Sequence, residues 1–241
     1  MDPRSSVMEK RFEQIKRIIG VASGKGGVGK SLTASTLALS LSKRYKVGLL
    51  DLDFYGPSAH VILGIKGAKI GEDKGIVPQE FHNLKFMSIV YFAGDNPLSL
   101  RGEDLSNGIV EMLAVTQWGS LDFLIIDLPP GMGDPTLDAV RLIKKMEFLI
   151  VTTPSKISLE VVKKELQLLK EAGAPIIGVI ENMKTSGKID FDCIGSIGFD
   201  EHIESAIGYI DKLLETEFAR ELKKIVGDLV EGKEEGKSQS I

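Results

Sequence analysis

The sequence has little cysteine, few aromatic residues, no excess of positive charge and no long apolar run. One cysteine among 241 residues cannot form an internal disulfide, nor by itself a four-thiolate metal site. The net charge of −4 gives no electrostatic footprint for a nucleic-acid backbone. No stretch reaches the roughly eighteen apolar residues of a membrane span, and the charged N-terminus lacks the apolar core of a signal peptide. We therefore expect a cytoplasmic protein with no nucleic-acid partner and no stable membrane association.

Apolar residues and glycine are plentiful, at 43% of the chain and 26 residues. The apolar runs are short and evenly spaced, and helical patterns lie between them, as in a parallel α/β sheet. Most runs are continuously apolar, which is typical of strands covered by helices on both faces. We therefore predict an α/β fold with a mostly parallel central sheet. The predicted strands are residues 18–22, 47–51, 84–91, 121–128, 148–152 and 176–180, and the predicted helices are residues 31–43, 105–118, 136–146 and 158–172.

The chain has no internal repeat and no linker strong enough to divide it. We expect one domain over residues 1–230, with a short N-terminal extension over 1–14 and a disordered polar tail over 231–241. Residues 64–79, rich in glycine, are interpreted as a hairpin outside the main sheet. Residues 213–230 place an apolar stripe on one helical face, formed by Leu214, Phe218, Leu222, Ile225 and Leu229. The opposite face mixes both charges, which favours core packing over membrane docking.

A glycine-rich loop follows the first predicted strand and leads into a helical pattern. It reads SGKGGVGKS over residues 23–31 and contains the phosphate-loop pattern G-x-x-x-x-G-K-[ST] in the setting that confirms it, which disfavours a turn that binds nothing. The glycines let backbone N–H groups turn inward around phosphate oxygens, and the helix adds its positive N-terminal dipole. Lys30 is expected to reach the β and γ phosphates, and the Ser31 hydroxyl to bind Mg²⁺. The predicted nucleotide-binding residues of this segment are Gly24, Lys25, Gly26, Gly27, Val28, Gly29, Lys30, Ser31 and Leu32.

Carboxylates end two further predicted strands. Ligands of an open parallel sheet lie beyond the carboxyl ends of its strands, so these positions belong to the same region. Asp51 and Asp53 should lie on one side of their strand's end, where either can hold Mg²⁺ or its water shell. Asp127 ends a Walker B-type strand that directs its carboxylate to Mg²⁺. The alternative for an acidic pair such as Asp51 and Asp53 is a helix cap or a turn.

The segment after the Walker B-type strand, residues 128–134, reads LPPGMGD. Prolines restrict this loop while glycines permit unusual dihedral angles. That combination suits a segment with two defined states that senses the γ phosphate. The alternative is a rigid connection between strand and helix.

The loop sequence GKGGVGKS resembles the deviant Walker A motif of the MinD, ParA, nitrogenase iron protein and Mrp group of P-loop ATPases. In those families the extra lysine, here Lys25, reaches across a dimer interface to the partner's nucleotide. The resemblance therefore implies a homodimer whose slow ATP hydrolysis depends on dimerisation. It also implies that Asp53 positions and activates the attacking water, which makes Lys25, Lys30 and Asp53 the catalytic residues. One departure is Leu32, where these families usually carry threonine.

Further segments resemble the Mrp/ApbC family within that group. They are residues 51–58 (DLDFYGPS), 101–102 (RG), 118–122 (WGSLD), 127–134 (DLPPGMGD), 151–154 (VTTP) and 181–183 (ENM). The resemblance, over about residues 15 to 200, implies an ATP- and Mg²⁺-dependent homodimeric scaffold or carrier for iron–sulfur clusters. The implied partner is a client apo-protein or an iron–sulfur assembly factor. It also implies that Asn182 recognises the adenine edge.

The family carries a C-x-x-C shortly after this ENM segment, and the four thiolates of a dimer bridge one cluster. Here Cys193 stands at the first position but Ser196 stands at the second, so a dimer offers two thiolates where clusters normally need four ligands. A lone histidine such as His202 is more often a surface or core residue than a ligand. The chain after residue 198 is shorter than in the family, and residues 207–210 are predicted to be a remnant strand.

Two other functions stay open beside the cluster carrier. The first is a metal-free, nucleotide-gated adaptor that binds a protein partner, which the missing thiolate favours. The second is a MinD- or ParA-like positioning ATPase on a membrane or on DNA, which the acidic balance and the DLDFYGPS segment disfavour.

Overall fold

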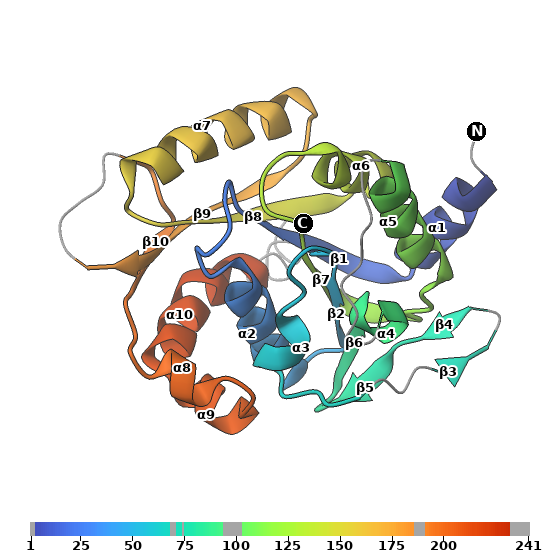
Figure 1. Ribbon diagram of the computed structural model, residues 1–241, viewed down its shortest axis with the longest axis horizontal. Coiled ribbons are helices and arrows are strands. Elements are labelled where there is room, and N and C mark those ends of the chain that lie inside the picture. The colour runs from blue at the N-terminus through green and yellow to red at the C-terminus, as the bar shows by residue number, and fades with distance from the viewer. Residues whose placement is uncertain (1–2, 68–70, 74, 94–102, 186–190, 232–241) are drawn as a thin grey trace, which may run out of the picture.

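The computed structural model describes residues 3–67, 71–73, 75–93, 103–185 and 191–231, and Figure 1 shows their arrangement. In this part of the chain the main sheet has eight strands in the order β10-β9-β8-β1-β7-β2-β6-β5. Every neighbouring pair is parallel except β5 with β6. The strands are β1 Ile15–Ala22, β2 Val47–Asp51, β5 Gln79–Phe81, β6 Leu84–Ser88, β7 Leu121–Asp127, β8 Met146–Thr152, β9 Ile176–Lys184 and β10 Gly195–Gly198.

Helices cover both faces of this sheet (Figure 1). One face packs against α2 Lys30–Ser42, α3 Ala59–Ile62, α9 Ile210–Glu215 and α10 Glu217–Glu231. The other packs against α1 Pro3–Glu13, α5 Glu103–Val115, α6 Asp134–Leu142 and α7 Lys156–Glu171. Short helices α4 Val90–Ala93 and α8 Ile203–Ala206 complete the described set.

The central strands alternate between the two apolar cores. On β1, Ile19 and Val21 belong to the core beneath α2, whereas Ile18 and Ala22 belong to the core beneath α7. All four are buried, as the continuous apolar run predicts for a strand with helices on both faces. The predicted α/β architecture with a mostly parallel sheet is confirmed.

Several predicted boundaries change in the structure. The first strand begins at Ile15 rather than at residue 18, and the run 84–91 divides into β6 and the short helix α4. The predicted hairpin in residues 64–79 is present as β3 Gly71–Glu72 and β4 Ile76–Val77, a separate two-stranded sheet. The N-terminal extension forms the helix α1, which packs against α5.

The prediction of a remnant strand at residues 207–210 is wrong. Ile207 ends α8, Gly208 adopts a left-handed turn with φ 80°, and Ile210 begins α9. Gly208 N–H donates to the carbonyl of Ile62, so this segment is tied to α3. The strand that ends the sheet is instead β10, which is parallel to β9 and which sequence patterning did not predict.

The predicted C-terminal helix is interrupted at Thr216. The hydroxyl of this residue accepts a hydrogen bond from the Ala219 N–H (3.2 Å), so Thr216 caps the start of α10. Phe218 and Leu222 are buried in the core, as predicted for this stripe. Helix α10 ends at Glu231, and the remainder of the predicted disordered tail lies outside the described residues, as does the Arg101–Gly102 pair. No described helix is long and apolar enough to cross a membrane.

Candidate functional site

The glycine-rich loop lies between β1 and α2, at the carboxyl ends of the central strands. Gly27 and Gly29 have φ values of 77° and 88°, a left-handed conformation that glycine adopts without strain. Helix α2 begins immediately afterwards, and both N–H and hydroxyl of Thr33 donate to the Gly29 carbonyl (2.9 and 2.8 Å). The loop therefore delivers its backbone to the N-terminus of a buried helix, the geometry that binds phosphate.

A cavity of about 510 Å³ opens over this loop. Its walls come from the loop, the start of α2, the segment after β2 and Pro130 of the loop after β7. The lining residues are Ser23, Lys25, Gly26, Gly27, Gly29, Lys30, Ser31, Leu32, Asp53, Tyr55, Gly56, Ser58, Ile62 and Pro130. The structure thus brings most of the predicted phosphate-loop residues and Asp53 to one cavity.

Lys30 is buried and points at the carboxylates of the neighbouring strands. Its Nζ donates to Oδ1 of Asp127 (2.6 Å) and lies 3.5 Å from Oδ2 of Asp53. Burial raises the pKa of Asp127, and the Lys30 ammonium opposes that rise. Lys30 therefore balances the acidic end of β7.

Asp51 and Asp127 are register partners on adjacent strands, and both are fully buried. Burial, followed by repulsion from Asp127, raises the pKa of Asp51 well above its usual range. Asp51 Oδ1 accepts the Asp53 N–H (3.0 Å), and Oδ2 accepts the Ser88 hydroxyl (3.4 Å). Asp51 thereby fixes the backbone of Asp53, whose Oδ1 in turn accepts the Gly56 N–H (3.1 Å).

The donor set fits Mg²⁺ delivered with a nucleotide. Oδ2 of Asp127 is buried and has no hydrogen-bond partner among the described residues, and the Ser31 hydroxyl lies 3.4 Å from Nζ of Lys30. No group of three or more His, Cys, Asp or Glu side chains in the described ranges could hold a metal. Mg²⁺ is usually bound by one or two carboxylates together with substrate phosphates, which agrees with that sparse set.

The segment predicted to be a switch contacts the phosphate loop directly. Gly131, with φ 82°, donates its N–H to the Ser23 carbonyl (2.7 Å), and its own carbonyl accepts the Thr136 hydroxyl (2.9 Å). Pro130 lines the cavity itself. A movement of the phosphate loop would therefore be transmitted to this segment through the hydrogen bond between Gly131 and Ser23.

Asn182, near the end of β9, contacts the other side of the loop. Its Nδ2 donates to the Val28 carbonyl (2.9 Å), and the side chain is buried. A second cavity of about 220 Å³ lies beside it, lined by Leu32, Asn182, Met183 and Phe218 together with residues 198–201, 203 and 204. Leu32 lines both cavities, so the cavity beside Asn182 adjoins the cavity over the phosphate loop.

Cys193 precedes β10 and Ser196 lies on this strand, and neither residue lines these cavities. The Cys193 thiol is half-buried, and burial with nearby Glu181 and Asp192 raises its pKa to about 11. The Ser196 hydroxyl donates to Oε2 of Glu181 (2.6 Å) and lies 3.3 Å from Nζ of Lys184. At neutral pH the thiol is thus protonated, and the position of the expected second ligand is engaged in a polar network.

Sequence reasoning missed Glu165, which lies behind the phosphate loop on the inner face of α7. The residue is 1% exposed, and neither carboxyl oxygen has a hydrogen-bond partner among the described residues. Its signal in the sequence is its spacing, because it shares the buried stripe of Val162 and Leu169.

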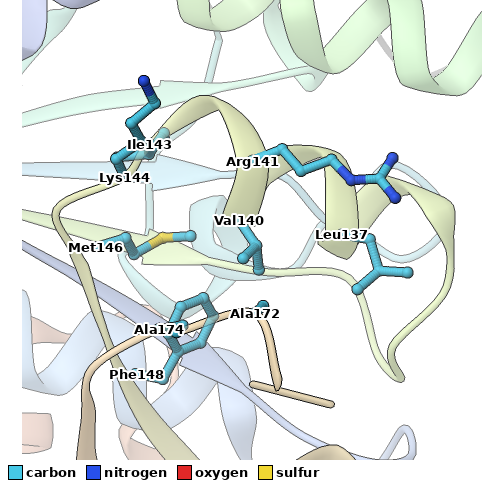
Figure 2. Close-up of a pocket in the computed structure, with 10 residues that line it drawn as sticks. Leu137, Val140, Arg141, Ile143, Lys144, Met146, Phe148, Ala172 and Ala174 are labelled. Atoms are coloured by element: carbon cyan, nitrogen blue, oxygen red, sulfur yellow. The ribbon is translucent and has the colours of Figure 1, made fainter. Parts of the chain in front are cut away.

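Another cavity, of about 450 Å³, lies between α6 and the start of β8. Figure 2 shows Val140, Met146 and Phe148 gathered there, while the charged ends of Arg141 and Lys144 extend away from them. It contains none of the predicted site residues, and its apolar lining offers no catalytic group.

Comparison with known proteins identifies the family. The family described as ParA: NUBPL iron-transfer P-loop NTPase matches residues 14–229. An iron–sulfur cluster carrier protein of Aquifex aeolicus is 44% identical over 179 residues, which cover 72% of this chain and 49% of that protein. The chain thus spans about half the length of that curated relative.

Solved structures agree on the fold. A nucleotide-binding protein of Archaeoglobus fulgidus, in complex with ADP, is 28% identical with a TM-score of 0.71, covering 88% of this chain and 93% of that one. The septum site-determining protein MinD of Pyrococcus horikoshii, with Mg-ADP, is 22% identical with a TM-score of 0.66, covering 93% and 99%. The second likeness shows the fold alone. The family model matches residues 14–229, a range that contains the main sheet. The chain therefore belongs to the ParA/NUBPL family of iron-transfer P-loop NTPases, and the resemblance to the Mrp/ApbC family is confirmed.

Proposed function

We propose that this protein binds ATP with Mg²⁺ and hydrolyses it slowly as a homodimeric switch of the iron–sulfur carrier type. The observation that carries the proposal is the buried Lys30 at the base of a 510 Å³ cavity, next to Asp127 and Asp53. On nucleotide binding, Lys30 would turn from Asp127 to the β and γ phosphates, which would leave the Asp127 carboxylate available to hold Mg²⁺. The bound Mg²⁺ would neutralise developing phosphate charge.

Within this proposal the protein's own groups have separate roles. Ser31 and Asp127 would hold Mg²⁺ with Asp51 near the metal, and Asp51 holds the backbone of Asp53 through its hydrogen bond. Asp53 orients the attacking water. Asn182 and Leu32 contact the base, and Leu32 has no hydroxyl for the phosphate contact that threonine would make. Glycines 24, 26, 27 and 29 supply backbone N–H groups to the phosphates.

Lys25 supports the homodimer because its side chain is exposed at the cavity rim. A cation that reaches the partner's transferring phosphoryl group acts like an arginine finger, which contributes roughly 10³- to 10⁵-fold to the rate in other hydrolases. We expect Lys25→Ala to leave ATP affinity within about threefold and to slow single-turnover hydrolysis by at least about tenfold. Sedimentation with and without ATP checks dimerisation in the same samples. Unchanged turnover in Lys25→Ala would refute the role in trans.

The proposed cargo is an iron–sulfur cluster, which is the cargo named for the Aquifex aeolicus relative. Cys193 of each subunit is the candidate ligand, with further ligands from a client apo-protein or an assembly factor. Anaerobic reconstitution with iron and sulfide, followed by iron and sulfide analysis of the dimer, tests this. Iron retained by the wild type and lost in Cys193→Ser supports cluster carriage. No retained iron contradicts carriage by this chain alone.

A metal-free, nucleotide-gated adaptor is the second candidate. The protonated Cys193 thiol and the engaged Ser196 hydroxyl favour it, because neither is prepared as a ligand. Affinity capture with ATP-bound, ADP-bound and nucleotide-free protein should then recover a partner in one state only. Identical partners in all three states would contradict gating.

The domain extent, the location and the partners of the protein complete the proposal. We propose one P-loop domain over residues 1–230, a cytoplasmic location, and no stable partner of nucleic acid or membrane. A MinD-like positioning role gains no support from a likeness of 22% identity, which shows only the fold. Cosedimentation with anionic liposomes in the presence of ATP would reveal membrane binding and overturn this part.

A further inference from the structure

Glu165 is a buried carboxyl group that none of the roles above uses. It lies on the inner face of α7, which packs along β8, and it is 1% exposed. A Cβ placed on Gly24 would lie 3.6 Å from its Oε2. The carboxyl group is therefore directly behind the first glycine of the phosphate loop.

The phosphate loop packs closely against α7 at this point. A Cβ on Gly24 would lie only 2.5 Å from Cγ1 of Val161, one turn before Glu165. The preceding residue is tied to the loop after β7, because the Ser23 carbonyl accepts the Gly131 N–H (2.7 Å). The backbone of residues 23 and 24 therefore lies close to Glu165, so a charge on this carboxyl group acts on the loop at short range.

No nearby cation balances Glu165 in the described residues. The charged side chains on α7, the loop, β8 and the start of α6 are Lys156, Glu160, Lys163, Lys164, Lys170, Glu171, Lys25, Lys30, Glu147 and Asp134. Those on α7, with Lys25 and Asp134, are exposed. Lys30 pairs with Asp127 and Glu147 with Arg17. Burial alone raises the pKa of Glu165 to about 7.

We propose that Glu165 links nucleotide binding to the uptake of one proton: the phosphate loop binds nucleotide with this carboxyl group neutral, and its ionised form opposes the phosphates. The inference rests on the proposed nucleotide site. The proton comes from the solvent and is held on the Glu165 carboxyl group, and no covalent bond to the nucleotide forms or breaks. Bound phosphates add negative charge in front of the loop, so they favour the protonated form further.

The test uses ADP with Mg²⁺, which is not hydrolysed, between pH 7.5 and 8.5, where the nucleotide's own phosphates are already ionised. Titration calorimetry in buffers of different ionisation enthalpy measures the protons taken up per ADP bound. The wild type should take up a fraction of a proton that approaches one, and its Kd should rise by up to about tenfold per pH unit above 7. Burial also raises the pKa values of Asp51 and Asp127, so the effect of Glu165 is measured by comparing variants.

Glu165→Gln keeps the shape of the neutral carboxyl group and should lose this proton uptake, with a Kd that varies much less with pH. Glu165→Leu is a second neutral variant with the same expected result. Glu160→Gln, which changes an exposed carboxylate on the same helix, is the matched control and should behave as the wild type. Equal proton uptake in wild type and both Glu165 variants overturns the inference. Absence of ADP binding by the wild type at every pH instead overturns the nucleotide site itself.

Discussion

Gly29 is the glycine of the phosphate loop whose substitution should cost the most stability in the free protein. Its φ of 88° is left-handed, which costs roughly 1–2 kcal/mol for a residue with a side chain. A Cβ at this position would overlap Nδ2 of Asn182 and displace the hydrogen bond to the Val28 carbonyl. A buried polar group left without its partner costs about 1–3 kcal/mol. Together these give a loss of about 3 kcal/mol for Gly29→Ala.

The measurement is thermal and urea unfolding of the nucleotide-free protein. A loss of about 3 kcal/mol lowers the Tm of a chain of this size by roughly 10 °C. Gly26→Ala is the matched control, because a Cβ at Gly26 would meet no atom within 4 Å. We expect it to keep the wild-type Tm within about 2 °C, since surface changes usually stay within about 0.5 kcal/mol. Equal losses in the two variants, or an unchanged Tm in Gly29→Ala, would refute the packing of Asn182 against this loop.

Three further predictions concern titratable side chains that are wholly or partly buried. Lys30→Ala should abolish nucleotide binding or turnover, which ADP titration measures. The same variant should destabilise the free protein by about 3–5 kcal/mol in urea unfolding, because Asp127 is left buried without its cation. The pKa of Glu165 is about 7 in the folded protein and 4.5 in the unfolded chain, so the free energy of unfolding should fall as the pH rises from 4.5 to 7. At pH 8, urea unfolding of Glu165→Gln should therefore give a free energy of unfolding up to about 3 kcal/mol above that of the wild type. The Cys193 thiol should react slowly with alkylating reagents at pH 8, and its rate should rise about tenfold per pH unit toward its pKa of about 11.

Most of the sheet and the phosphate loop could be predicted because their signals are local. Continuous apolar runs identified β2, β7 and β8 to within two residues at each end. The rule that ligands lie beyond the carboxyl ends of parallel strands predicted that Asp51 and Asp127 share one region, and the structure adds that they are register partners. The ion pair between Lys30 and Asp127 was not predicted, because the sequence analysis assigned Lys30 to the phosphates.

The parts that were missed depend on contacts between distant segments. Strand β10 reads Gly-Ser-Ile-Gly, a sequence with little intrinsic preference for a strand, and it exists because its backbone pairs with β9. Residues 207–210 contain two isoleucines and a tyrosine, but the Gly208 N–H bonds to Ile62 and turns the chain toward a helix. Spacing alone would put Glu165 on the buried stripe of α7, but its position behind the phosphate loop, with no hydrogen-bond partner among the described residues, depends on how α7 lies against the loop.

The end of β9 connects the nucleotide cavity with the segment that carries the cysteine. Three consecutive residues face three neighbours: Glu181 accepts the Ser196 hydroxyl of β10, Asn182 donates to Val28 of the phosphate loop, and Met183 lines the smaller cavity with a strained φ of 57°. Movement of Asn182 on nucleotide binding would therefore be transmitted to β10 through one peptide unit. Ser196→Cys would exchange the 2.6 Å hydrogen bond to Glu181 for a weak thiol donor. For that reason we expect this variant to loosen β10 as well as to supply a thiolate. We therefore expect faster amide exchange in β10 of this variant than in the wild type, and iron retained by Ser196→Cys but not by the wild type would contradict cluster carriage by the wild-type chain alone.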